Sequence, residues 1–173
     1  MDRSERHIMK TKPMKNAKTA QRATAAAPLP LRIKSILVPI DFSPPSKRAL
    51  ECAGTFARQF KAKLTLLHVV EPVGLPEFAA AYPLMVEDDR FLAATKSELE
   101  RLARTARVPR GSVAKILVRF GRSFHEIADA ARTGKVDLII ISTHGYTGLK
   151  HVVLGSTAER VVRHAPCPVL VVR

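Results

Sequence analysis

The stretch STHGYTGLKHVVLGST, residues 142–157, has the composition of an anion-binding loop. It contains three glycines and no acidic residue, and hydroxyl residues stand at both of its ends. Gly145 and Gly148 permit positive φ and a close approach of the backbone to a ligand. Gly155-Ser156 stands at the expected start of a helix, where free N–H groups and the helix dipole favour negative charge. The residues predict an anion site, and the alternative is a run of turns with Ser156 capping its own helix.

Two familiar phosphate-binding motifs are absent from the chain. It has no GxxxxGK[ST] sequence, and the turn after the first apolar run reads Pro39-Ile40-Asp41-Phe42-Ser43 where a dinucleotide fold needs GxGxxG. Asp41 is a candidate ligand for a nucleotide or magnesium, and otherwise an acid that ends a strand. No second carboxylate has a sequence reason to join it, which argues against a general acid–base pair. The histidines lack zinc-ligand spacing, and His68, inside an apolar run, is expected to be buried and hydrogen-bonded rather than catalytic.

Apolar runs alternate with helical patterns from residue 33 onward. Helices are expected after Ser46, over 86–107, and after Ser123 and Ser156, where Ser-x-x-Glu sequences predict capping boxes. Strand and helix in alternation require right-handed crossovers and a parallel sheet, and strands that are apolar throughout require helices on both faces. The predicted fold is a single doubly wound α/β domain over residues 33–173. Its strands are expected at 33–40, 64–70, 113–120, 136–141 and 169–172.

The net charge of +14 is unevenly distributed along the chain. Residues 1–34 hold nine Lys and Arg against two acids, which is half of the excess. We expect residues 1–32 to be a disordered basic tail. It is either an arm for nucleic acid or another anionic surface, or a plain solvated extension, and the absence of aromatic residues for base stacking favours the extension. Binding by the tail would depend strongly on salt and be lost on deleting residues 1–30.

Composition also bears on the cellular location. No run of about 18 apolar residues exists, so no membrane span is expected, and the basic segment lacks the apolar centre of a secretory signal. Cys52 and Cys167 are far apart and form no CxxC pair. We expect a reduced cytoplasmic chain with two packing thiols, a single disulfide being the alternative.

Several motifs, in the correct order, resemble those of universal stress proteins. The sequence Ser142-Thr143-His144-Gly145, nine residues, then Gly155-Ser156 is similar to that family's G-x-x-G, nine residues, G-[ST] signature. Residues 36–43, 66–69 and 155–172 also match its pattern, so the resemblance covers about residues 33–173. It implies a Rossmann-like sheet of order 3-2-1-4-5 and, in one branch of the family, ATP bound between strands one and four.

The resemblance also implies which residues hold the nucleotide. Asp41 would contact the ribose or adenine side near Pro39 and Ile40, and the backbone of Val69 would meet the adenine edge. Ser142 replaces the first glycine of the signature, and another branch of the family lacks the glycines and does not bind ATP. Because the later glycines are retained, we favour the binding branch. The phosphates would be cradled by Ser142, His144, Gly145, Gly155, Ser156 and Thr157.

The predicted function is that of a cytoplasmic, ATP-binding stress regulator or sensor rather than a dedicated enzyme, with magnesium as a companion of ATP. The alternatives are a ligand-free dimeric stress scaffold and a slow ATPase that uses Asp41. The resemblance implies a homodimer, because in that family the C-terminal strand, here residues 168–173, pairs with its copy across a two-fold axis. An apolar edge strand is usually paired or covered, and the alternative is shielding by the tail. Phe78 and Tyr82, in the loop 72–83, would either close over a nucleotide or pack at the dimer.

Overall fold

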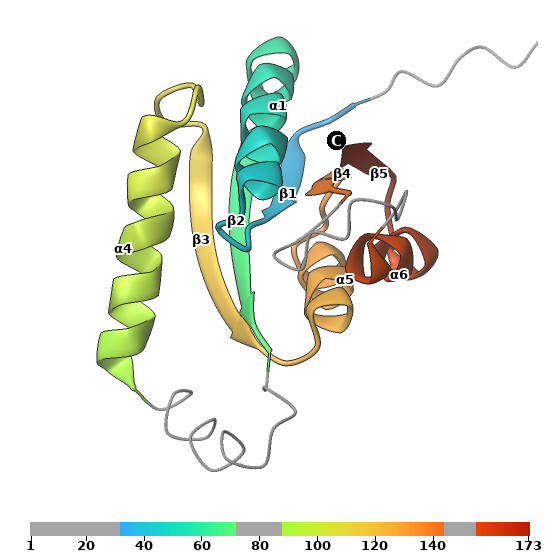
Figure 1. Ribbon diagram of the computed structural model, residues 1–173. Helices are drawn as coiled ribbons and strands as arrows, with labels where there is room; N and C mark the ends of the chain where they lie inside the picture. The colour runs from blue at the N-terminus through green and yellow to red at the C-terminus, as the bar shows by residue number, and fades with distance from the viewer. Residues whose placement is uncertain (1–31, 72–87, 144–154) are drawn as a thin grey trace, which may run out of the picture. The chain divides into compact units, whose positions relative to one another are not determined.

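The protein was analysed as a computed structural model, which describes residues 32–71, 88–143 and 155–173. Its five strands form one parallel sheet of order β3-β2-β1-β4-β5 (Figure 1). The predicted doubly wound α/β fold and the order 3-2-1-4-5 are therefore confirmed. The strands are β1 (Ser35–Pro39), β2 (Lys63–Val70), β3 (Val113–Phe120), β4 (Leu138–Ser142) and β5 (Val169–Val172).

The described helices cover both faces of the sheet (Figure 1). On one face, α1 (Pro44–Phe60) and α4 (Asp89–Thr105) bury Leu50 and Leu99 against the sheet. On the other, α5 (Ser123–Thr133) and α6 (Ser156–His164) bury Ile127 and Val161. Two apolar clusters result, one on each side of strands whose side chains point alternately to the two faces. The all-apolar strands of the sequence are explained by this double cover.

Three predicted helix caps are wrong, and the hydrogen bonds and ion pairs of the residues concerned show why. Ser43, not Ser46, caps α1, and its hydroxyl accepts a hydrogen bond from the Ser46 amide while two prolines fill the first helical turn. Neither predicted Ser-x-x-Glu box forms, since Arg122 and Gly155 are the N-cap residues of α5 and α6 and neither makes a capping hydrogen bond with its own side chain. The two glutamates of the boxes bind arginines instead, Glu126 with Arg119 and Glu159 with Arg163.

The strand and helix bounds differ by a few residues from the prediction at several ends. β3 and β5 have the predicted bounds, whereas β1 is shorter than 33–40 and β4 begins two residues later than predicted. The later start of β4 is explained by Asp137, because its carboxylate accepts hydrogen bonds from the Lys34 and Ser35 amides at 2.7 and 2.9 Å. A side chain therefore joins β1 to the start of β4. The helix predicted over 86–107 begins in the described chain at Asp89, because Asp88 caps it, and ends at Thr105.

The pairing between β1 and β4 is short. β1 pairs with β2 along its whole length, from Ser35 to Pro39, but with β4 only at Ile36 and Leu37. Two central strands that pair for two residues and then separate leave space between their carboxyl ends. This is the position at which the strand order reverses, from β2 on one side of β1 to β4 on the other.

Pro39 accounts for the point at which β1 and β4 separate. Lys34 and Ile40 bond through their backbones to β2, and Ser35 accepts from the Asp137 amide on the opposite side. Because successive residues of a strand face opposite neighbours, Pro39 faces β4, as Ser35 does. Its ring nitrogen carries no hydrogen and cannot continue the ladder. The β1–β4 pairing therefore ends where the proline stands.

Two further predictions concern thiols and membranes. Cys52 and Cys167 are both free and half-buried, so the alternative of a disulfide between them is wrong. Burial raises the pKa of each thiol, and the charge of Asp137 raises that of Cys167 further, which lowers the reactivity of both at neutral pH. Among the described residues, no helix is long and apolar enough to cross a membrane.

A glycine inside α1 supplies a test of the packing. A Cβ at Gly54 would lie 2.6 Å from the carbonyl oxygen of Arg107, in the segment that follows α4. Gly54→Ala should therefore lower the free energy of unfolding by about 1–3 kcal/mol through overpacking, although alanine is the better helix former by about 1 kcal/mol. Urea unfolding measures the change. The matched control is Thr55→Ala on the exposed side of the same helix, expected to stay within about 0.5 kcal/mol of wild type. A more stable Gly54→Ala protein would contradict this packing.

Candidate functional site

A pocket of about 230 Å³ lies where β1 and β4 separate. Pro39, Ile40 and Asp41 line it from the end of β1, and Ile141, Ser142 and Thr143 from the end of β4. The carboxyl ends of parallel strands beside a reversal of strand order are where open α/β sheets hold their ligands. Its other walls are Leu67 and Val69 of β2, Ser46 of α1, Ser123 and Ile127 of α5, and residues 155–158 at the start of α6.

The pocket gathers eight of the ten residues that the sequence predicted. The other two, His144 and Gly145, lie outside the described residues, as do the loop 72–83 and the tail up to residue 31. Sequence reasoning predicted Val69 of β2 but missed Leu67 of the same strand and both residues of α5, although Leu67 stands two residues before Val69 and so shares its face. The eight are Pro39, Ile40, Asp41, Val69, Ser142, Gly155, Ser156 and Thr157.

The polar side of the pocket is the N-terminus of α6. The Gly155 amide donates to the Thr143 carbonyl at 2.7 Å, which ties the start of the helix to the end of β4. The next amides, of Ser156, Thr157 and Ala158, have no acceptor within their own helix, and the N-cap residue, Gly155, has no side chain to cap it. The helix dipole adds partial positive charge at this end. An anion in the pocket would meet these amides first.

Ser142, where the family signature has glycine, stands in ordinary strand backbone. It is the last residue of β4, it is 8% exposed, and its φ is not among the positive values found in the described chain. A glycine is required where φ is positive or where a Cβ has no room. The first condition does not apply here, so serine is compatible with the backbone at this position.

Asp41 supplies the negative side of the pocket. Its Oδ1 accepts from the Ser43 amide at 3.0 Å and from the Ser43 hydroxyl at 2.5 Å, so one carboxylate oxygen is fixed by the turn that starts α1. Among the described residues that line the pocket, Asp41 is the one titratable side chain. No group of three or more potential metal ligands occurs in the described chain. A single carboxylate is a hydrogen-bond acceptor for a ligand rather than a dedicated metal cage.

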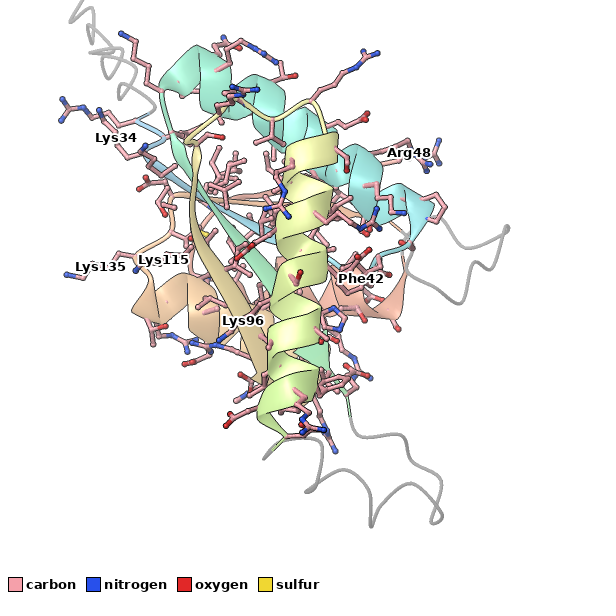
Figure 2. The ribbon with its side chains drawn as sticks, turned by 90° about the vertical axis from the view of Figure 1, so that its left-hand side faces the viewer. Lys34, Phe42, Arg48, Lys96, Lys115 and Lys135 are labelled. Carbon is pink, nitrogen blue, oxygen red and sulfur yellow. The ribbon has the colours of Figure 1, made fainter. Side chains whose placement is uncertain are left out.

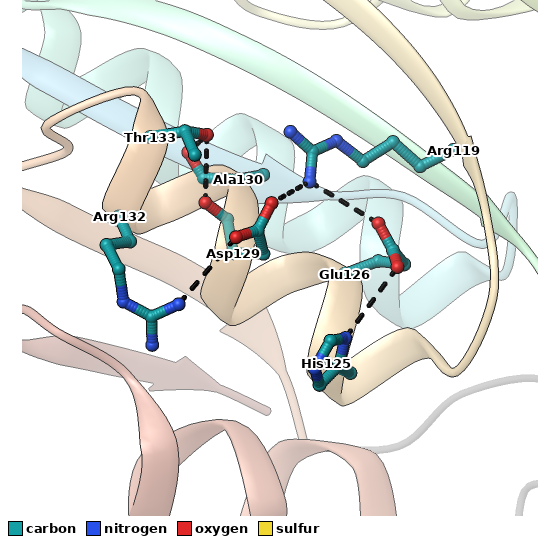
Figure 3. Close-up of polar contacts among 7 residues, drawn as sticks. All are labelled: Arg119, His125, Glu126, Asp129, Ala130, Arg132 and Thr133. Carbon is teal, nitrogen blue, oxygen red and sulfur yellow. Dashed lines mark hydrogen bonds and ion pairs between the residues drawn. The ribbon is translucent and has the colours of Figure 1, made fainter.

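An ionic cluster attaches α5 to β3 (Figure 3). The helix α5 carries two further pocket residues, Ser123 and Ile127. Arg119 Nη1 lies 3.3 Å from Glu126 Oε2 and 2.7 Å from Asp129 Oδ2. The hydrogen bond from Arg119 lowers the pKa of Asp129 below its ordinary value of 3.8, against a smaller opposing effect of burial. The cluster joins an edge strand to the helix that closes one side of the pocket.

The N-terminus of α5 is already occupied by a carboxylate. Glu71, which follows β2, accepts a hydrogen bond from the Ser123 amide. A carboxylate at a helix N-terminus satisfies one of its free amides and complements the dipole. Although α5 and α6 both point their N-termini at the pocket region, α6 is the one whose start is not held by a protein carboxylate among the described contacts.

Comparison with known proteins agrees with this architecture. The model of the universal stress protein family matches residues 32–173. The chain belongs to the universal stress protein family. The resemblance drawn from the motifs is thereby confirmed.

Three similar proteins match along most of their length. A universal stress protein of Thermus aquaticus is 38% identical over 144 residues, which is 81% of this chain and 98% of the relative. The solved structure of the universal stress protein UspA from Lactobacillus plantarum has a TM-score of 0.69 and 30% identity, covering 82% of this chain and 99% of that one. A universal stress protein solved in complex with cAMP has a TM-score of 0.58 at 22% identity, with 82% and 98% coverage, and its likeness concerns the fold alone.

The Arg119 cluster predicts a specific dependence of stability on pH. Because the pKa of Asp129 is lowered in the folded protein, its stabilising effect is fully present above about pH 4 and is lost as the pH falls through the folded value. Asp129→Asn should therefore be less stable than wild type at neutral pH, and the difference should shrink in acid. Urea unfolding at several pH values measures it.

The control for this experiment is Glu100→Gln. Glu100 forms an exposed pair with Arg104 on α4 at 3.5 Å, of a kind that contributes about 0–1 kcal/mol. Glu100→Gln should therefore change the free energy of unfolding little at neutral pH. A difference between Asp129→Asn and wild type that is the same in acid and at neutral pH would contradict the prediction.

Proposed function

We propose that this universal stress protein binds ATP, or a close adenine nucleotide, in the pocket between β1 and β4 and acts as a stress-response regulator or sensor. One observation carries the proposal. The pocket combines a fixed carboxylate, Asp41, with apolar walls and the N-terminus of α6, whose N-cap residue is a glycine without a capping side chain. A ligand that satisfies all three has hydrogen-bond donors, a flat apolar body and a negative charge.

The charges of the pocket favour one orientation of such a ligand. A carboxylate only accepts hydrogen bonds, so Asp41 suits ribose hydroxyls or an amino group and repels phosphate. Leu67, Val69 and Ile127 provide an apolar surface for a base. The amides at the start of α6 suit the phosphates. The base and sugar would therefore lie over the carboxyl ends of β1 and β2, with the phosphates at the start of α6.

The size of the pocket is consistent with a nucleotide that is only partly enclosed by the protein. Its volume of about 230 Å³ is below the range of about 300–1,000 Å³ that is usual for enclosed small-molecule sites. The nucleoside part would be enclosed, and the phosphates would lie at the mouth. Magnesium, if present, would be brought by the phosphates, since Mg²⁺ in nucleotide sites takes much of its coordination from phosphate and water.

Hydrolysis at this site would be slow at best. Phosphoryl transfer needs a group that orients water and cations that stabilise the transition state. In the described pocket lining, Asp41 is the single titratable residue, and Ser43 already holds one of its oxygens. We therefore propose a binding protein before an ATPase. The alternative of a ligand-free scaffold rests on Ser142, and the universal stress protein solved with cAMP supports only the capacity of the fold to hold an adenine nucleotide.

We also propose a homodimer through β5. This strand stands at the end of the sheet and pairs within the chain with β4, and its four side chains are half-buried. An open apolar edge of this kind is usually paired or covered. Sedimentation would give the mass of a monomer if the proposal were wrong.

Calorimetric titration with ATP and magnesium tests the binding proposal. Wild type should bind, and Gly155→Val should bind at least about tenfold more weakly because it adds a branched side chain beside the amides of α6. Gly155 has φ −67° and ψ 151°, which valine adopts readily, so the variant should fold. Ala114→Val on the exposed part of β3 is the control and should bind as wild type does.

Small molecules released from denatured pure protein provide an independent measurement. Mass analysis should detect an adenine nucleotide if the protein retains its ligand through purification. If ATP and magnesium gave no heat with wild type, and the titration of Gly155→Val did not differ from that of wild type, nucleotide binding would be rejected and the scaffold alternative favoured.

A further inference from the structure

His68 lies on the face of the sheet opposite to the pocket. In β2, the side chains of Leu67 and Val69 line the pocket, so His68 between them points to the side covered by α1 and α4. Sequence reasoning predicted a buried, hydrogen-bonded histidine, and the structure gives a half-buried one that is hydrogen-bonded. Its partner belongs to the turn that carries Asp41.

The hydrogen bond of His68 defines its tautomer. Nδ1 lies 2.7 Å from the carbonyl oxygen of Ile40. A carbonyl can only accept, so Nδ1 must carry the hydrogen and donate it. The Ile40 amide in turn donates to the Leu67 carbonyl at 2.8 Å. Both backbone groups of Ile40 are therefore held by consecutive residues of β2.

The imidazole ring also contacts Phe42. The two ring centroids are 4.8 Å apart, with the planes inclined by 47°. Phe42 has φ 65°, in the left-handed region that a bulky residue rarely adopts. Such a conformation persists only when its surroundings hold it. Phe42 lies beside the start of α1 (Figure 2), where it packs against the cluster of that face.

His68 thus contacts the residues on both sides of Asp41. Ile40 precedes the carboxylate and Phe42 follows it, while Asp41 itself lines the pocket. Ser43 then fixes one oxygen of the carboxylate. The turn is held from the far side of the sheet by one side chain.

We infer that His68 is a positioning residue for the pocket: its Nδ1–H bond to Ile40 and its ring contact with Phe42 hold the turn 40–43 so that Asp41 faces the ligand. Its effect on a ligand rests on the proposed function. Its effect on the turn does not, because the ordering of residues 40–43 is present in the protein without a ligand.

Two substitutions separate the hydrogen bond from the ring. His68→Phe keeps a ring against Phe42 but removes the donor, and leaves the Ile40 carbonyl without its partner. His68→Asn removes the ring but has an amide nitrogen near the position of Nδ1. The matched control is Ser112→Ala, which also removes a side-chain donor to a carbonyl, at 2.7 Å from Pro109, before the start of β3 and away from the pocket lining.

Affinity for ATP is the first readout, by calorimetry. His68→Phe should weaken it about tenfold, which is the effect of losing about one net hydrogen bond. His68→Asn should remain within about threefold of wild type, and Ser112→Ala should bind as wild type does. Equal losses in both His68 variants would reject the hydrogen bond as the cause, and wild-type affinity in His68→Phe would overturn the inference.

Amide exchange of the ligand-free protein is the second readout. The Ser43 amide donates a hydrogen bond to the Asp41 carboxylate. Its hydrogen should exchange with solvent faster in His68→Phe than in Ser112→Ala when both are compared at equal global stability. If wild type binds no ATP, the proposed function fails, and this measurement still decides the role of His68. Unchanged exchange at Ser43 in His68→Phe would overturn that role.

Discussion

The separation of β1 from β4 after two paired residues is the constraint on which the site depends. At one end, the Asp137 carboxylate joins the two strands through the amides of Lys34 and Ser35. At the other, Pro39 faces β4 without a hydrogen to donate, and the ladder ends. Since α1 and α6 follow these strands on opposite faces of the sheet, the space that opens is lined by the start of one helix and the turn before the other.

The chemistry of the pocket depends on where polar groups are already satisfied. Glu71 occupies the N-terminus of α5, and Ser43 holds one oxygen of Asp41. The glutamates of the two predicted capping boxes bind arginines instead, and the N-cap residue of α6 is Gly155, which has no side chain to cap it. The pocket therefore has a negative end at β1 and a positive end at α6, and this separation of charge gives a ligand its direction.

Much of the fold was predictable from the sequence because its patterns are local. Apolar runs of four to eight residues between helical patterns gave all five strands, with β3 and β5 at their observed bounds. The family motifs supplied the strand order and eight residues of the pocket. Helix starts were less predictable, since a Ser-x-x-Glu pattern caps a helix only when its glutamate has no stronger partner. Arg119 is such a partner for Glu126, and it belongs to a strand rather than to the helix.

The sequence by itself determined the succession of strands and helices, the double cover of the sheet and the membership of the family, because hydrophobic period and motif spacing are properties of neighbouring residues. Only the tertiary structure decided that Leu67, Ser123 and Ile127 share a pocket with Asp41, and that His68 holds the Asp41 turn from the opposite face. These contacts join residues that are far apart in the chain. Which polar group a side chain binds depends on the neighbours that the folded sheet brings to it, and no local pattern contains that information.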